Sequence, residues 1–179
     1  IQAVTIDTKG ALWCGTWGRG IGYSLNGRNF RHLEGEDIAR TKVSDFLQIG
    51  DHMLVGTAKG LYSFDINKPE NGPLSRVFPY RKIKDLMLDS KQRLWVGTQE
   101  GGLLVFDYKN DPTFSNPTFF NATNNPTTGL FSERISKMAE DMEGNIWIGT
   151  YYGLYLFNES NATFKRMDVG ASKFPSVIV

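Results

Sequence analysis

Asp141-Met142-Glu143-Gly144-Asn145-Ile146-Trp147-Ile148-Gly149-Thr150 is the stretch that decides the fold, because its last five residues have three counterparts elsewhere in the chain. The counterparts are Leu12-Trp13-Cys14-Gly15-Thr16, Met53-Leu54-Val55-Gly56-Thr57 and Leu94-Trp95-Val96-Gly97-Thr98. Their glycines follow one another at intervals of 41, 41 and 52 residues. Self-similarity at such a period indicates a repeat architecture.

Each copy lies within a larger unit with the same internal spacing. An apolar pair three residues apart precedes every copy: Ile1/Val4, Val43/Phe46, Ile83/Leu86 and Ile135/Met138. A second apolar block follows a glycine in each unit, at 21–25, 61–65, 103–107 and 154–158. Weaker apolar stretches at 29–33, 74–80 and 162–167 complete the pattern in three units. The sequence therefore predicts four short strands per unit.

The predicted central strands are apolar on both faces, since Ile146 and Ile148 point one way and Trp147 the other. A sheet with such strands must be covered on both sides. Four-stranded units of roughly 40 residues, each packed between its neighbours, are typical of β-propeller blades. The predicted fold class is therefore all-β: a β-propeller with four tandem four-stranded blades.

The phase of the repeat also predicts the domain organisation. Blades are expected at 1–41, 42–81, 82–133 and 134–173, with an irregular loop insertion at 108–129 that is rich in Asn, Pro and Thr. A fifth blade is expected to start at 174–179, because 174–178 resembles 131–135. We therefore expect a fragment of a larger propeller, whose exposed end blades favour self-association.

Charge and composition exclude several classes of partner. The chain carries 20 Lys and Arg against 19 Asp and Glu, and a net charge of +1 provides no broad field for nucleic acid or an anionic membrane. No apolar run approaches the roughly 20 residues of a membrane span. The single Cys14 cannot form an internal disulfide. We expect neither nucleic-acid binding nor direct membrane contact.

The pattern Asp-x-x-Gly-x-Ile/Leu-Trp-x-Gly-Thr, followed by Gly-Leu-Tyr-x-Phe-Asp/Asn, closely resembles the two-component regulator propeller repeat; its best copies lie at 141–150 and 89–98. The resemblance implies the periplasmic sensor region of a hybrid two-component histidine kinase. In that family, propellers bind a carbohydrate breakdown product and a following β-sandwich domain passes the change to the kinase. It implies a ligand-sensing extracytoplasmic segment whose partners are an oligosaccharide or other small molecule and the remaining blades of the parent chain.

Loops at one face of a propeller are free to vary, so we expect the ligand there. Aromatic side chains can stack on a sugar, and polar ones can bind its hydroxyls. The candidate ligand-binding residues are Trp17, Arg19, Lys59, Arg81, Gln99, Glu100, Arg134, Tyr151 and Tyr152. The four cations among them would favour an anionic sugar. In the alternative interpretation, the aromatic residues only cap blade edges and the charges are solvated.

The sequence favours binding over catalysis. His32 and His52 belong to different units and have no metal-ligand partner at useful spacing, while Cys14 has no His nearby in sequence. We expect no catalytic residues, no metal and no cofactor in this segment; any kinase activity would belong to the parent protein. A protein-interaction scaffold is the alternative function. A propeller lyase or glycosidase ranks last, because Glu100 is the only carboxylate in the loops between the second and third strands, at 17–19, 58–59, 99–101 and 151–152.

Overall fold

The computed structural model describes residues 1–33, 38–73, 75–79, 81–111, 113–122 and 126–168. Blade 1 contains β1 (Ala3–Ile6), β2 (Leu12–Gly15), β3 (Ile21–Ser24) and β4 (Arg31–His32), and blade 2 contains β5 (Val43–Ile49), β6 (His52–Thr57), β7 (Gly60–Asp65) and β8 (Ser75–Pro79). Blade 3 contains β9 (Ile83–Leu88), β10 (Arg93–Thr98), β11 (Leu103–Asp107) and β12 (Thr118–Phe120), and blade 4 contains β13 (Ile135–Glu140), β14 (Ile146–Thr150), β15 (Gly153–Asn158) and β16 (Thr163–Arg166). Two short 3₁₀ helices, η1 (Pro69–Asn71) and η2 (Pro126–Thr128), lie in connections.

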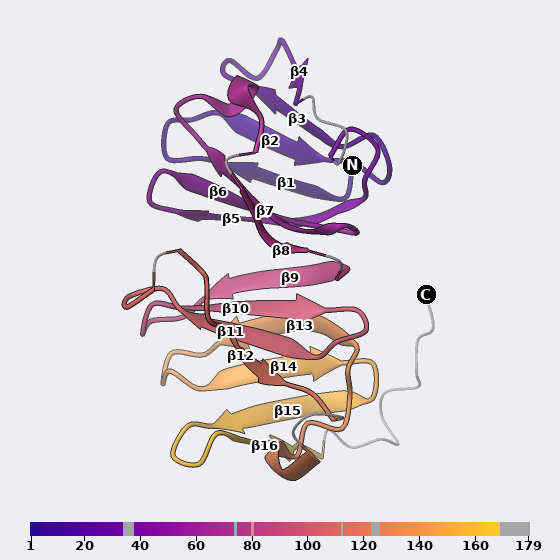
Figure 1. Cartoon of the computed structure of the whole chain (residues 1–179), viewed down its shortest axis with the longest axis vertical. Coiled ribbons are helices and arrows are strands. Elements are labelled where there is room, and N and C mark those ends of the chain that lie inside the picture. The colour runs from indigo at the N-terminus through magenta and orange to yellow at the C-terminus, as the bar shows by residue number, and fades with distance from the viewer. Residues whose placement is uncertain (34–37, 74, 80, 112, 123–125, 169–179) are drawn as a thin grey trace.

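Each sheet is an antiparallel meander whose strands follow sequence order. Figure 1 shows the four sheets stacked along the long axis of the molecule, with blades 1 and 4 at opposite ends. The predicted all-β architecture of four tandem four-stranded blades is confirmed. Within the described residues, no helix is long and apolar enough to cross a membrane.

The predicted loop at 108–129 needs a correction. It contains β12, the fourth strand of blade 3, which pairs with β11, and it also contains η2. Phe120 is buried there against the rings of Phe157 and Phe164 of blade 4. This nonlocal packing stabilises a strand where the Asn-Pro-Thr composition indicates a loop. The expected fifth blade at 174–179 lies outside the described residues.

An aspartate–tryptophan hydrogen bond explains why Asp precedes Trp by six residues. The indole Nε1 donates to Oδ2 of the aspartate at 2.8 Å in each of three pairs: Asp7–Trp13, Asp89–Trp95 and Asp141–Trp147. The other oxygen of each aspartate accepts two backbone amides of the turn between the first two strands. Hydrogen bonds from Trp147 and Asn145 lower the pKa of Asp141 to about 2. One carboxylate thus joins the turn to the blade core.

Neighbouring blades meet through a glycine in one and an aliphatic side chain in the next. A Cβ at Gly15, Gly56 or Gly97 would lie 2.4 to 2.7 Å from the side chain at the start of the following blade. Those aliphatic residues are Val43, Ile83 and Ile135, which are all buried. The missing side chain lets the sheets approach closely, which accounts for glycine in a strand interior.

Carboxylates on the first strands of blades 2 and 3 add polar links between blades. Asp45 accepts the backbone amide of Leu86 at 2.9 Å, and Asp85 accepts that of Met138 at 2.7 Å. Lys137 forms an ion pair with Asp85. Burial raises the pKa of Asp85 to about 6, although the hydrogen bond and charge of Lys137 oppose that shift. Blades 2 and 3 each anchor the first strand of the following blade by a bond from a carboxylate to a backbone amide.

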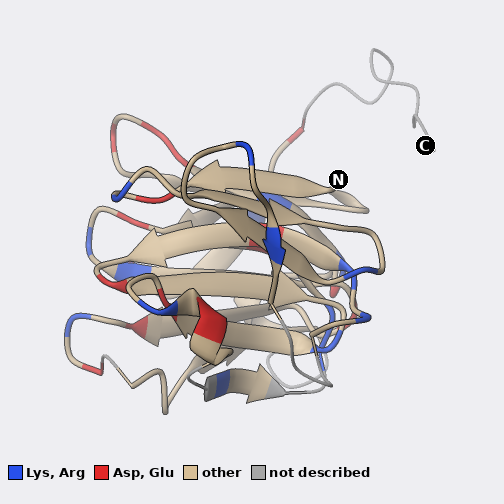
Figure 2. Cartoon of the chain, turned by 90° about the horizontal axis from the view of Figure 1, so that it is seen from above, with Lys and Arg blue, Asp and Glu red and all other residues tan. Residues whose placement is uncertain are grey.

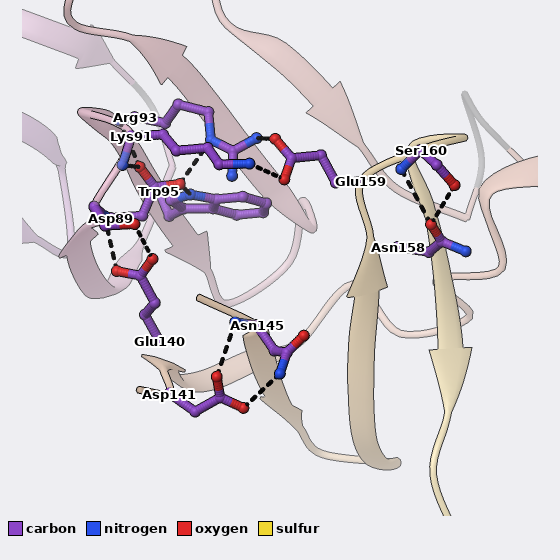
Figure 3. A network of polar contacts seen from close by, with 11 residues as sticks. Asp89, Lys91, Arg93, Trp95, Glu140, Asp141, Asn145, Asn158, Glu159 and Ser160 are labelled. Carbon is purple, nitrogen blue, oxygen red and sulfur yellow. Dashed lines mark hydrogen bonds and ion pairs between the residues drawn. The ribbon is translucent and has the colours of Figure 1, made fainter. Parts of the chain in front are cut away.

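A charged network links blades 3 and 4 at the edge of the sheets that carries the turns between their first two strands (Figure 3). Glu159 accepts from Lys91 and, at 3.0 Å, from Arg93, while Glu140 accepts the amide of Ser90 at 2.7 Å. The hydrogen bond from Lys91, followed by the charges of Arg93 and Lys91, lowers the pKa of Glu159, while burial opposes the shift. Glu140 and Glu159 are thus already paired within the protein.

Candidate ligand-binding face

Strand register brings two sets of loops to one edge of the propeller. The start of each first strand pairs with the end of the second: Val43 faces Thr57, Ile83 faces Thr98, and Ile135 faces Thr150. The connections before the first strands and the loops after the second strands therefore share one edge. We call it the loop edge; its described residues are 16–20, 38–42, 58–59, 81–82, 99–102, 129–134 and 151–152.

Backbone hydrogen bonds join these two sets of loops in the same way three times. The amides of Ala58, Gln99 and Tyr151 donate to the carbonyls of Lys42, Lys82 and Arg134 at 2.8, 2.8 and 3.0 Å. A cation thus precedes the first strand in blades 2, 3 and 4 and lies beside a variable loop.

The threonine that ends each Gly-Thr motif shapes the loop that follows it. Its hydroxyl donates to the carbonyl of the glycine at the start of the third strand, at 2.9 to 3.0 Å: Thr16 to Gly20, Thr57 to Gly60, Thr98 to Gly102 and Thr150 to Gly153. Three of these hydroxyls also accept a loop amide, from Arg19, Lys59 and Tyr152. The repeat thereby fixes a short loop whose tip side chains are free to vary.

We expect Thr150→Val to loosen the loop that carries Tyr151 and Tyr152. The substitution leaves the Gly153 carbonyl and the Tyr152 amide without their shared partner, and should cost about 1 kcal/mol of unfolding free energy. Hydrogen exchange at the Tyr152 amide should become faster. Thr118→Val is the matched control, since Thr118 is exposed on β12. Unchanged exchange at Tyr152 would contradict this role for the hydroxyl.

The structure distributes the nine predicted residues over separate groups along the loop edge. Trp17 is exposed, and the Nζ of Lys42 lies 3.5 Å from the centre of its ring. At blade 4, the guanidinium of Arg134 lies 5.5 Å from the ring centre of Tyr151, which contacts Tyr152 edge to face. No contact between described residues joins Trp17 to the tyrosine pair. The aromatic residues therefore form two separate platforms on the loop edge, one at blade 1 and one at blade 4.

The remaining predicted residues lie between these platforms. The guanidinium of Arg81 packs against Gly101, and Glu100 forms an exposed ion pair of 3.8 Å with Lys82. Gln99 lines a cavity beside them. Arg19 and Lys59 are exposed at loop tips. Their role in ligand binding stays a prediction.

Sequence reasoning missed two lysines that line this cavity, Lys42 and Lys84. The cavity has a volume of about 160 Å³ and lies between the first strands of blades 2 and 3; Ser44 and Lys82 also line it. A signal for Lys42 is present in the sequence, because Lys42, Lys82 and Arg134 each stand directly before the apolar pair of their unit. Lys84 gives no such signal, since Ser44 and Ser136 occupy the equivalent positions.

A larger cavity of about 340 Å³ lies at the opposite edge, beside blade 4. Its polar lining includes Asn145 and Glu159, which already bind Asp141 and the Lys91–Arg93 pair. The cavity at the loop edge differs, because Lys42 and Lys84 have no ion pair within the described part of the chain. No cluster of three His, Cys, Asp or Glu side chains suited to a metal occurs among the residues the structure describes.

The fold and the repeated loop geometry define the class of this molecule, a β-propeller built of tandem blades. Residues 129–152 match the family described as two component regulator propeller, which confirms the resemblance seen in the repeat. No curated protein matches the sequence.

Solved structures extend the likeness to the fold of nearly the whole chain. The extracellular domain of the putative hybrid two component system BT4673 from B. thetaiotaomicron aligns with a TM-score of 0.74 at 20% identity, covering 96% of this chain and 22% of that one. The corresponding domain of BT3049 from the same organism gives 0.68 at 20% identity, with 92% and 22% covered. PorZ of Porphyromonas gingivalis, a surface component of the type-IX secretion system, gives 0.66 at 17% identity, with 92% and 27% covered. The chain spans about a fifth to a quarter of the length of these relatives.

Proposed function

We propose that the chain is a segment of an extracytoplasmic, periplasmic sensor propeller of a hybrid two-component system, which binds an oligosaccharide and signals to a membrane histidine kinase. The repeat match at 129–152 carries this proposal. The likeness of fold to extracellular domains of putative hybrid two component systems supports it. The segment itself acts by binding and carries out no reaction.

The chemistry of the loop edge supports a sugar as the ligand. Trp17, Tyr151 and Tyr152 are 60 to 66% exposed, although large aromatic side chains gain free energy from burial. The threonine bonds described above close the loops that carry them, so the rings project from a fixed backbone. A sugar can stack its apolar face on such a ring while Gln99 or Arg134 binds its hydroxyls.

Signalling follows if the ligand binds one arrangement of the parent sensor more tightly than another. Binding then shifts the population toward the preferred arrangement by the difference in affinity. The inter-blade bonds of Asp45 and Asp85 would keep the blades together during such a change.

A panel of oligosaccharides tests this function directly. We expect at least one member to raise the melting temperature of the chain. Trp17→Ala or Tyr151→Ala should then weaken its binding by about tenfold, as for a central aromatic contact. Phe30→Ala is the control, because Phe30 is also exposed but lies at the opposite edge. Absence of any shift across a broad panel would count heavily against the proposal.

A protein-interaction scaffold is the second candidate, and the outer face of blade 1 favours it. Val4 and Ile6 are 62 and 67% exposed there, whereas Phe46 and Met138, the counterparts of Val4, are 9% exposed. A second copy of the chain would cover this face in the way that each blade of the chain covers the next. A scaffold predicts copurification of a partner and no response to sugars, which distinguishes it from the sensor.

A further inference from the structure

Three lysines surround the cavity at the loop edge. Lys42 and Lys82 stand directly before β5 and β9, and Lys84 belongs to β9 itself. Ser44 and Gln99 also line the cavity, and the Ser44 hydroxyl is bonded to the carbonyls of Gly56 and Ile83. Among the described residues, the acidic partner of these lysines is Glu100, which forms an exposed ion pair of 3.8 Å with Lys82. Exposed pairs of this kind contribute little.

The arrangement places like charges near each other, and no ion pair between described residues neutralises Lys42 or Lys84. Burial, followed by the charge of Lys84, lowers the pKa of Lys42. Asp45 and Asp85 interact with Lys137 and with backbone amides, and no ion pair between described residues joins them to Lys42 or Lys84. A bound anion would remove the repulsion and supply the missing hydrogen-bond acceptors.

The wider distribution of charge agrees with an anionic ligand. In Figure 2, the edge that carries the N-terminus shows mainly Lys and Arg, whereas the opposite edge shows both signs. Described cations of the loop edge include Arg19, Lys59, Arg81 and Arg134, in addition to the three lysines of the cavity. Glu34, Glu36 and Asp37, which precede Lys42 in sequence, lie outside the described residues.

An aromatic platform adjoins the cavity. The Nζ of Lys42 lies 3.5 Å from the ring centre of Trp17, so the indole and the cavity share this lysine. Trp17 remains 66% exposed despite that contact, which leaves most of the ring open to a ligand. A cation beside an open aromatic face suits a molecule that combines an anionic group with a sugar ring.

We propose that this cavity binds the carboxylate or sulfate group of an acidic oligosaccharide between Lys42 and Lys84, with the adjoining sugar ring against Trp17. The cavity of about 160 Å³ is smaller than the roughly 300–1,000 Å³ of sites that enclose a drug-sized ligand, so it holds one charged group and leaves the rest of the chain on the surface. This inference rests on the proposed sensor function and names the ligand class.

Matched ligand pairs test the inference. The probes are tetragalacturonate and its methyl-esterified neutral form, together with a sulfated carrageenan tetrasaccharide and its desulfated form, each titrated calorimetrically into the chain. We expect one acidic probe to bind about tenfold or more tightly than its neutral counterpart, with affinity that falls as salt is added. The pair that shows the preference distinguishes a carboxylate from a sulfate.

Lysine variants then locate the site. The double variant Lys42→Gln, Lys84→Gln should lose the preference for the acidic probe. The double variant Lys68→Gln, Lys109→Gln removes the same charge from exposed positions at the opposite edge and should keep it. Urea denaturation of both variants shows whether they are folded.

The two proposals fail in different ways. Equal binding of acidic and neutral probes overturns the anion inference and leaves the sensor function in place. A preference that survives in the Lys42, Lys84 variant overturns the assignment of the cavity. If no probe binds and no neutral oligosaccharide raises the melting temperature, both proposals are wrong.

Discussion

Asp89→Ala is expected to lower the free energy of unfolding by about 3–5 kcal/mol. Asp89 is buried and accepts the amides of Lys91 and Arg93, the guanidinium of Arg93 and the indole of Trp95. An alanine leaves the indole N–H of Trp95 without an acceptor inside a fully buried environment. The turn amides of Lys91 and Arg93 lose their acceptor at the same time, so the costs of several unsatisfied donors combine in the unfolding free energy.

Urea denaturation monitored by tryptophan fluorescence measures this loss. Gln48→Ala is the matched control, because Gln48 occupies the equivalent position in blade 2, where Leu54 replaces the tryptophan. The hydrogen bonds of Gln48 to Thr8 and Gly50 are exposed to solvent, so its loss should cost less than about 1 kcal/mol. A value for Asp89→Ala as small as that of the control would show that the carboxylate is not the anchor of the turn.

The Asp89 contacts also show why the fold could be predicted from the sequence. The Asp-to-Trp spacing of six residues recurs because one carboxylate must reach both its own turn and the indole in the next strand. Such bonds lie within one hairpin, so their geometry repeats at a constant offset in the sequence. Blade 2 lacks both the aspartate and the tryptophan. This is expected, because a buried tryptophan without the aspartate would leave its indole N–H without an acceptor.

Features that depend on contacts between blades were not predictable in the same way. β12 lies in an Asn- and Pro-rich segment, and its strand conformation depends on Phe120 packing against blade 4. Lys42 and Lys84 lie about one repeat apart in the chain and meet at one cavity only because adjacent first strands pack side by side. The local pattern indicates a strand or a loop, but it does not indicate which side chains from different blades converge.

Gly97→Ala is expected to destabilise the junction between blades 3 and 4. A Cβ at this position would lie 2.6 Å from Cγ2 and 3.1 Å from Cβ of Ile135. The first distance is shorter than the contacts that carbon atoms make in a packed core. Overpacking of this size costs about 1–3 kcal/mol. The sign of the change in unfolding free energy is informative. Without a clash, alanine would stabilise the protein, because it lowers the backbone entropy of the unfolded chain.

Two further variants separate the clash from a backbone effect. Gly18→Ala adds a Cβ into open space, so it should raise the unfolding free energy by up to about 1 kcal/mol rather than lower it. Ile135→Ala removes the Cγ2 that obstructs the new methyl group, so the double variant with Gly97→Ala should cost less than the sum of the single variants. Strict additivity would mean that the glycine does not serve the approach of the two blades. A smaller combined cost would show that Gly97 and Ile135 set the contact between blades 3 and 4. The glycine of the repeat would then be required for neighbouring blades to pack closely.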